Sequence, residues 1–293
     1  MIRPLLRSIL LTGFISLLTL TAALAEDAKP AKILFFTKSA RFEHAVIAQK
    51  DGQPSFAEKI LAGMGAKGNF TITTTKDGGA MTPENLAKYD ALMFFTSGDL
   101  CQAEQKDKSV PMTPEGKAAF IQAVKNGLPF ICVHNALKTF DGAKGDTIDP
   151  YNEMLGGIGI GHGKIQMGKN IAVDTKFPGF EGLTDGIAIS EEWYSSKNFA
   201  PDIHVLLVQD PAGMKDGLYQ RPPWPATWAR MYGQGRVFVT GMGHLEETWT
   251  NPVFQSVLNG GIQWALGRVK ADITPNLDTA APKYAELPQT GKK

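Results

Sequence analysis

Three of the five histidines in the chain follow segments that have the pattern of buried strands. His134 comes directly after the apolar run FICV, His244 follows RVFVT through Gly-Met-Gly, and His44 follows the first apolar run through a short loop. Ligands of an open α/β sheet bind at the carboxyl ends of its strands, so these side chains can meet in one crevice. Neutral imidazoles are common ligands of divalent metals. We therefore predict a metal site at His44, His134 and His244; the alternative for each residue alone is an exposed loop histidine.

A carboxylate would complete this site and leave one coordination position open. We predict Glu246, two residues after His244, as the fourth ligand, with Glu192 as the other candidate. Such donors suit zinc or manganese. No nucleotide cofactor is expected, because the glycines of the segment 157–161 follow a helical pattern and not the first strand of a βαβ unit. These glycines instead bring His162 toward the crevice.

Several residues near the predicted site have the chemistry to bind a sugar. Trp193 and Tyr194 follow two glutamates, and aromatic rings stack on the apolar C–H face of a sugar. Asn135, next to His134, is also predicted to bind substrate. Asp99, after the run ALMFFTSG, either bonds a sugar hydroxyl or caps a turn. Burial in the core is the more common position for Trp224, Trp228 and Trp249, and for His204 within an apolar run.

Short apolar runs alternate with helical patterns along the first half of the chain. The runs are typical of strands buried on both faces of a parallel sheet and cover residues 32–37, 70–75, 91–96 and 130–134. Helices are predicted over 45–64, from Thr82-Pro83, and over 113–126, where Thr-Pro and Asn-Gly supply capping chemistry. This alternation predicts an α/β fold with a doubly wound, flavodoxin-like, mostly parallel sheet.

The pattern changes between Gly156 and about Asp210, where glycines are frequent and the alternating runs are shorter, as in 170–173 and 204–208. We predict an inserted region of antiparallel strands and loops here. The chain then returns to the core with runs at 226–231 and 236–240 and a helix over 252–266. Hydrophobic periodicity ends beyond Arg268, so a single domain is predicted over 26–271 and a flexible tail over 272–293.

The first residues have the features of a secretory signal peptide. Arg3 and Arg7 precede an apolar run from Ile9 to Leu20, and the small-residue segment Ala23-Leu24-Ala25 follows it. A signal is therefore predicted over 1–25, with a periplasmic or secreted mature protein. The run is shorter than the roughly 20 residues that span a bilayer, so an uncleaved anchor is the weaker alternative. No membrane association is expected after cleavage.

The charge and cysteine content exclude some classes of function. The chain has 30 basic and 29 acidic residues and contains no Lys/Arg cluster, so no nucleic-acid partner is expected. The two cysteines, Cys101 and Cys132, cannot form a disulfide framework, and whether they pair is left open. The oligomeric state is also left open, a homo-oligomer included.

Five motifs in order resemble the landmarks of one known family. They are RFEHAVI, FICVHNAL, MLGGIGIGH, EEWY, and PATWARMYGQGRVFVTGMGH followed by ETWTNPVFQSVLNGGIQWALG, and they extend from about residue 32 to residue 268. The chain resembles the ThuA-like (trehalose utilisation) branch of the class I glutamine amidotransferase-like superfamily. This resemblance implies the doubly wound fold described above.

The resemblance also locates the position of the superfamily's catalytic cysteine. The segment Gly127-Leu128-Pro129-Phe130-Ile131-Cys132-Val133-His134 is similar to the superfamily's strand-to-helix elbow and puts His134 where the nucleophile would stand. Cys132 falls two residues earlier, on a buried strand, where a thiol lacks both exposure and an activating base. We therefore exclude glutaminase chemistry.

The resemblance implies use of trehalose or related disaccharides, in pathways where the sugar is first oxidised to a keto derivative. A ketone acidifies the neighbouring C–H group, a metal polarises the carbonyl oxygen, and a nearby His or Glu moves the proton. His134, His162 and Glu192 are predicted as the catalytic residues. Isomerisation, elimination or hydrolysis of a small-molecule keto-glycoside would all follow from this chemistry.

Two other classes of function remain open. The first is a non-catalytic carbohydrate-binding or accessory protein that keeps the crevice. The second is a glycoside hydrolase with paired carboxylates, for which adjacent glutamates are poor candidates because neighbouring strand residues point to opposite faces. The carboxylates available for that reading are Glu191, Glu192, Glu246 and Glu247.

Overall fold

The computed structural model describes residues 29–140 and 148–288. The predicted signal peptide, residues 1–25, lies outside the described residues. Within the described ranges, no helix combines the length and the apolar character needed to cross a membrane.

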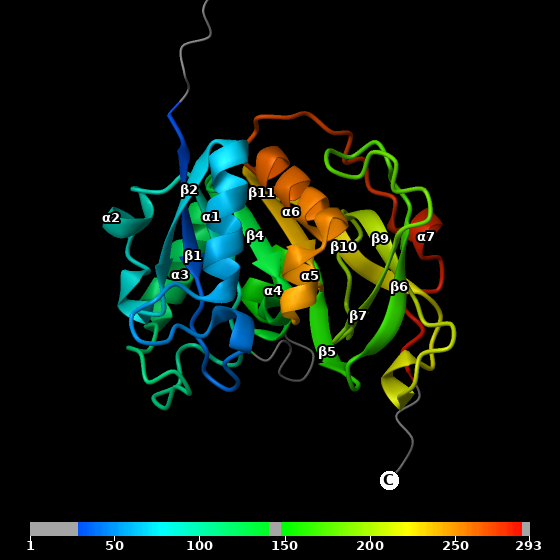
Figure 1. Cartoon of the computed structure of the whole chain (residues 1–293), viewed down its shortest axis with the longest axis horizontal. Coiled ribbons are helices and arrows are strands. Elements are labelled where there is room, and N and C mark those ends of the chain that lie inside the picture. Colours follow the sequence, from blue (N-terminus) through cyan, green and yellow to red (C-terminus); the bar gives the residue numbers. More distant parts are fainter. Residues whose placement is uncertain (1–28, 141–147, 289–293) are drawn as a thin grey trace, which may run out of the picture.

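One nine-stranded sheet with the strand order β2-β1-β3-β4-β11-β10-β9-β6-β7 forms the centre of the protein (Figure 1). Its first five strands pair in parallel, and their order matches the 2-1-3-4-5 order of flavodoxin-like sheets. Strands β3 and β4 are buried along their whole length, as their uninterrupted apolar runs predict. The parallel strands are β1 (Ala31–Phe36), β2 (Phe70–Thr75), β3 (Ala91–Phe94), β4 (Phe130–Val133) and β11 (Gly235–Thr240).

Antiparallel strands extend the same sheet beyond β11. These are β10 (Trp224–Tyr232), β9 (His204–Asp210), β6 (Gln166–Ala172) and β7 (Ile187–Glu191). A separate two-stranded sheet pairs β5 (Ile158–His162) with β8 (Tyr194–Lys197). The predicted fold class is therefore confirmed, and most of the predicted insertion continues the central sheet.

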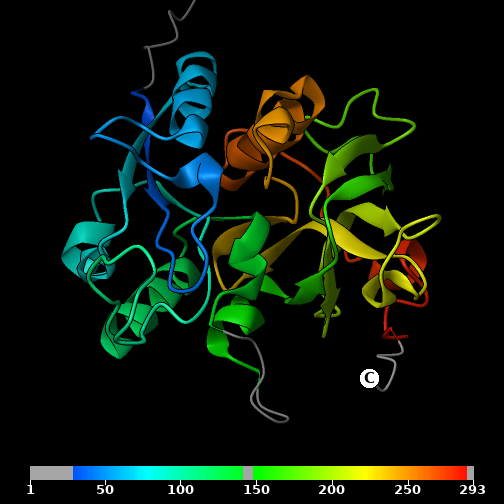
Figure 2. The same cartoon turned by 60° about the horizontal axis from the view of Figure 1, so that its bottom comes forward.

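Helices cover both faces of the sheet. Helices α1 (Phe56–Gly68) and α6 (Pro252–Ala265) lie in front of it in Figure 1, with the short α5 (Glu246–Thr250) beside them. Figure 2 shows α3 (Pro114–Lys125) on the opposite side, where α2 (Pro83–Leu86) and α4 (Pro150–Leu155) contact it. The remaining helical turns are η1 (Ala45–Ile47), η2 (Gly78–Ala80), η3 (His134–Lys138), η4 (Gly217–Tyr219) and α7 (Leu277–Ala280).

The capping residues that the sequence identifies are confirmed, but one predicted helix begins later than expected. Thr82 and Thr113 cap α2 and α3 with their hydroxyl groups. The helix predicted over 45–64 is wrong in its first half, where only the turn η1 forms. Left-handed backbone at Gly52 breaks the helical path, and Ser55 then starts α1 with a capping box.

The predicted flexible tail is corrected for its described part. Asn276 accepts a hydrogen bond from the Val205 N–H group and donates one to the Val205 carbonyl, so the segment is bound to the backbone of β9. Leu277 and Ala281 are buried behind it. The weak periodicity of this segment concealed the packing, because its other core contacts come from the partly buried side chains Ile273, Ala280 and Tyr284.

Candidate metal centre

Four side chains from separate parts of the chain meet at the carboxyl ends of the parallel strands. His44 follows β1, His134 follows β4, His244 follows β11, and Glu192 follows β7. One potential ligand atom from each residue lies within 4.8 Å of the others. The predicted convergence of His44, His134 and His244 is therefore confirmed.

The distances within this cluster suit a single metal ion. His134 Nε2 lies 3.2 Å from His244 Nδ1. Glu192 Oε2 lies 3.1 Å from His244 Nδ1, 3.5 Å from His134 Nε2 and 4.0 Å from His44 Nε2. Ligands bound at about 2.0–2.1 Å in a tetrahedron lie roughly 3.3 Å apart, so small shifts would bring these four atoms onto one ion.

The backbone fixes the direction of the His134 ring. His134 is the first residue of η3 and has a left-handed φ of 50°, which is uncommon for a residue other than glycine. This strained strand-to-helix turn is the elbow geometry that the sequence predicts at this position. His134 Nδ1 lies 3.0 Å from the Gly241 carbonyl oxygen. An Nδ1–H group that donates to this carbonyl leaves the Nε2 lone pair directed at the cluster.

A buried carboxylate, Glu191, fixes the loop that carries His244. Glu191 accepts hydrogen bonds from the backbone N–H groups of Gly243 (3.0 Å) and His244 (3.1 Å) and from the Thr248 hydroxyl (2.7 Å). The Trp249 indole donates to the Gly243 carbonyl at 2.8 Å. Gly243 has a φ of 129°, where a side chain would strain the turn. Adjacent glutamates therefore have different roles, since Glu192 faces the imidazoles and Glu191 positions one of them.

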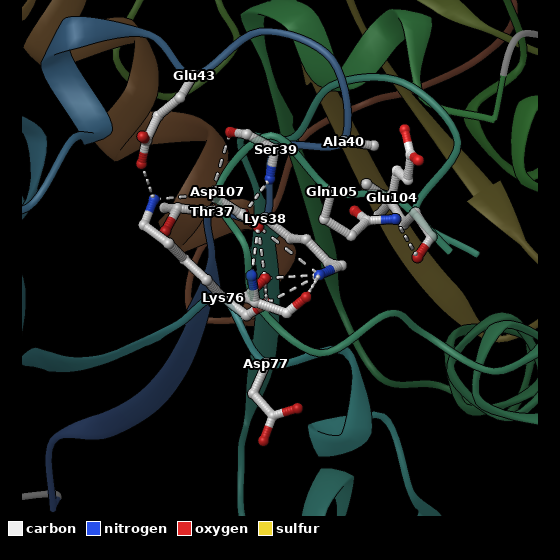
Figure 3. A network of polar contacts seen from close by, with 12 residues as sticks. Thr37, Lys38, Ser39, Ala40, Glu43, Lys76, Asp77, Glu104, Gln105 and Asp107 are labelled. Atoms are coloured by element: carbon white, nitrogen blue, oxygen red, sulfur yellow. Dashed lines mark hydrogen bonds and ion pairs between the residues drawn. The ribbon is translucent and has the colours of Figure 1, made fainter. Parts of the chain in front are cut away.

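Lys76 holds both ends of the segment that carries His44. Its ammonium group donates to the carbonyls of Thr37 (3.1 Å) and Ile47 (3.2 Å) and pairs with Glu43 at 2.9 Å. Figure 3 shows Lys76 and Glu43 facing each other above the end of β1. The segment has little regular secondary structure, so these contacts fix its path.

A second lysine, Lys38, supports the beginning of the same loop. The Lys38 side chain is fully buried, and its ammonium group donates to the Ser109 hydroxyl (2.6 Å) and carbonyl (3.2 Å). Asp107 lies 3.9 Å from this ammonium group and accepts a hydrogen bond from the Ser39 N–H group at 2.6 Å (Figure 3). Burial lowers the pKa of Lys38, and the facing Asp107 offsets part of that effect.

The protonation states in the cluster favour metal binding. Burial lowers the pKa of His134 from 6.5 to about 3 and also lowers the pKa of His44, so both imidazoles are neutral near pH 7. Burial alone would raise the pKa of Glu192, but the facing imidazoles of His134 and His244 hold it well below its ordinary value. Burial opposes the charge on His244 as well, yet contact with Glu192 raises its pKa. Metal ligation needs neutral imidazoles and an ionised carboxylate. Of the four residues, only His244 would have to lose the proton of its cationic form.

His44 provides an independent test of whether a metal fits. Its side chain is 2% exposed, and neither ring nitrogen has a hydrogen-bond partner among the described residues. A buried imidazole normally pairs both nitrogens, because desolvating an unpaired polar atom is costly. An ion ligated by Nε2 would satisfy one of them.

A pocket of about 160 Å³ opens beside the cluster. His162 reaches the cluster from this pocket, since its Nδ1 lies 3.1 Å from Glu192 Oε1. The Tyr194 hydroxyl donates to Asn135 Oδ1 at 2.6 Å, which leaves the Asn135 amide N–H groups for a ligand. The structure thus brings the predicted residues His162, Asn135 and Tyr194 together. Arg41 and Lys138 also line the pocket.

Three predicted site residues lie outside this arrangement. Glu246 is exposed in the first turn of α5 and is not part of the cluster; Glu192 takes the place predicted for it. Trp193 is 2% exposed and donates to the Gln166 carbonyl, so it packs in the core and presents no face to a sugar. Asp99 accepts a hydrogen bond from the Cys101 N–H group and closes a turn.

Other expectations from the sequence are confirmed. Cys132 is fully buried in β4, and burial raises the pKa of its thiol far above the ordinary value, so it cannot act as a nucleophile. Cys101 and Cys132 are both free thiols. His204 is a structural residue that contacts Asp174 and the Thr274 carbonyl. Trp224, Trp228 and Trp249 are fully buried, as expected, and each donates its indole N–H group to a backbone carbonyl.

Sequence reasoning missed Glu191 as a support and Arg41 and Lys138 as pocket residues. Lys138 follows His134 by four residues, so one turn of η3 separates them. Arg41 belongs to the same RFEH segment as His44. Proximity in sequence to the predicted ligands was the available signal for both basic residues.

The chain matches the family model described as ThuA, trehalose utilisation, over residues 32–265. No functionally curated protein matches it. Among solved structures, a protein described as ThuA-like from Bacteroides uniformis superposes with a TM-score of 0.59 at 18% identity, covering 84% of this chain and 96% of that one. A second, from Parabacteroides merdae, gives 0.55 at 17% identity, covering 89% and 97%. A β-galactosidase from Bacillus circulans gives 0.50 at 10% identity over 84% of this chain and 32% of that one, which shows a shared fold alone.

Proposed function

The chain belongs to the ThuA family, and we propose that it is a carbohydrate-metabolising enzyme that binds one divalent metal ion on His44, His134, Glu192 and His244. The observation that carries this proposal is the buried imidazole of His44, whose ring nitrogens have no hydrogen-bond partner among the described residues, in a set of four donors within 4.8 Å of one another. Zinc and manganese are the ions that suit these donors.

We propose that the substrate is a keto-sugar or an oxidised, trehalose-like disaccharide. A bound ion would act as a Lewis acid on a carbonyl oxygen of the substrate. His162 would transfer the proton of the adjacent carbon, because it lies in the pocket and its Nδ1 faces Glu192 Oε1 at 3.1 Å. The carboxylate would orient the His162 ring, and Asn135 would bind a sugar hydroxyl with its amide group. Isomerisation and elimination each follow from such a proton transfer, and addition of water to the eliminated product would make the overall reaction a hydrolysis.

Export to the periplasm or the cell exterior remains part of the proposal. It rests on the charged, apolar and small-residue segments of residues 1–25. Mass spectrometry of the protein expressed in a bacterial host with a periplasm would detect a chain that begins at Glu26. A full-length chain retained in the cytosol would refute export without affecting the site.

Metal content is the first experiment. The protein purified without chelator should contain about one zinc or manganese per chain by elemental analysis, and His44→Ala should lose it. His204→Gln is the matched control, because His204 is also buried but lies outside the cluster. Equal metal content in wild type and His44→Ala would refute the proposed site.

Activity is the second experiment. A panel of 3-keto-glycosides should be converted by the metal-loaded enzyme, with activity lost on addition of chelator and restored by the metal. His162→Asn should lower kcat by roughly 10²–10⁴ while metal content is unchanged, as expected for loss of an acid–base group. A metal-bound protein that binds these glycosides without converting any would be a binding or accessory protein instead.

A further inference from the structure

The basic side chains of the pocket bear on the kind of sugar it accepts. Lys138 lies at the end of η3, is partly buried and lines the pocket. Its ammonium group forms no hydrogen bond or ion pair with any residue in the ranges 29–140 and 148–288. The other lysines near the site differ, since Lys38 and Lys76 are each bound to several oxygen atoms.

The rest of the pocket has the same polarity. Arg41 lines it as well, and none of the described residues that line it is an aspartate or a glutamate. The amide N–H groups of Asn135 are further donors, because Asn135 Oδ1 is occupied by the Tyr194 hydroxyl. A neutral sugar offers hydroxyl groups that both donate and accept, whereas these residues mainly donate. A partly buried ammonium group without a partner is best satisfied by an anion.

We propose that the sugar bound in this pocket carries an anionic group, a carboxylate or a phosphate ester, which pairs with Lys138. This inference rests on the proposed function and narrows its substrate class from keto-sugars in general to sugar acids or sugar phosphates. Lys138 is a specificity-determining residue in this reading and takes no part in metal ligation.

The test compares sugars that differ mainly at one carbon. D-Glucose, D-glucuronate and D-glucose 6-phosphate are titrated calorimetrically into the zinc-loaded protein. At least one of the two anions should bind roughly tenfold or more tightly than glucose, as expected for a charge-assisted hydrogen bond. The two anions distinguish carboxylate from phosphate as the preferred group.

Variants separate Lys138 from the metal as the source of the preference. Lys138→Met should lower the affinity for the anionic sugars to about that for glucose. Lys138→Arg should retain most of the preference for the anions. Lys88→Met is the control for loss of one positive charge, because Lys88 is exposed just beyond the C-terminal end of α2 and does not line the pocket. Equal affinity for glucose and both anions would overturn the inference, and so would a preference that survives in Lys138→Met.

The outcome is separable from that of the proposed function. Zinc content is measured on every sample, and Lys138→Met should retain the metal. If the wild-type protein binds no metal, the proposed function fails, and the same titrations on the metal-free protein still test Lys138. If metal binds and charge makes no difference, only the present inference fails.

Discussion

His134 Nε2 lies 3.2 Å from His244 Nδ1, although 110 residues separate them in the chain. The Nε2 lone pair of His134 faces His244, because the Gly241 carbonyl holds the other ring nitrogen of His134. His244 Nδ1 must therefore carry a proton in the metal-free protein, and Glu192 Oε2 at 3.1 Å accepts from the same group. A metal ion would replace this one shared proton.

Metal binding should release one proton, so the logarithm of the association constant should rise with pH with a slope of about one. His44 and His134 are already neutral because burial lowers their pKa values, the latter to about 3, whereas contact with Glu192 raises the pKa of His244 above 6.5. Just below the raised pKa of His244, the association constant for zinc should rise about tenfold per pH unit, and above that pKa it should level off. Competition titrations with a fluorescent zinc indicator would measure this slope. A slope near three would mean that all three imidazoles are protonated in the metal-free protein.

Glu191→Gln should weaken metal binding although Glu191 is not a ligand. The amide presents only one acceptor oxygen to the N–H groups of Gly243 and His244, so the His244 loop loses its fixed position. Such supporting contacts affect metal affinity by about 10–100-fold. The free energy of unfolding should also fall by roughly 1–3 kcal/mol, because buried donors lose a partner. Glu247→Gln, exposed on the nearby α5, should change neither quantity, and unaltered zinc affinity in Glu191→Gln would contradict this role.

Lys76→Met should loosen the segment that carries His44. The variant loses the hydrogen bonds to the Thr37 and Ile47 carbonyls and the ion pair with Glu43. We expect about 1–3 kcal/mol less stability in urea unfolding and roughly tenfold weaker zinc binding. The exposed Lys88→Met is again the control. Destabilisation without any change in zinc affinity would show that Lys76 supports the fold but not the site.

Cys132→Ala should leave the chemistry intact. The side chain is fully buried, so its loss should cost about 1–2 kcal/mol of stability through the small cavity left in β4. Zinc content should remain that of wild type. Iodoacetamide should modify Cys132 only after unfolding, because burial raises the pKa of the thiol. Rapid alkylation in the native state, with loss of activity, would argue for a thiol mechanism.

The strand-end histidines could be predicted from the sequence because local patterns carry that information. Uninterrupted apolar runs mark strands buried on both faces, and the residue after such a run falls at the ligand-binding edge of a parallel sheet. His134 after FICV and His244 after RVFVT are positions of this kind. The capping residues Thr82 and Thr113 could also be predicted from the sequence, because capping depends on atoms within one turn.

The carboxylate of the cluster was not decided by the sequence. Glu246 is close to His244 in the chain, but its position in the first turn of α5 turns it toward solvent. Antiparallel strands continue the central sheet as far as β7. Glu192 directly follows β7 and therefore reaches the imidazoles. The sequence by itself determined the fold class and the three imidazoles of the cluster, through periodicity and strand-end position. The tertiary structure decided which glutamate faces them, why Trp193 is buried and where Lys138 points, because each of these depends on contacts between segments whose spacing along the chain carries no such information.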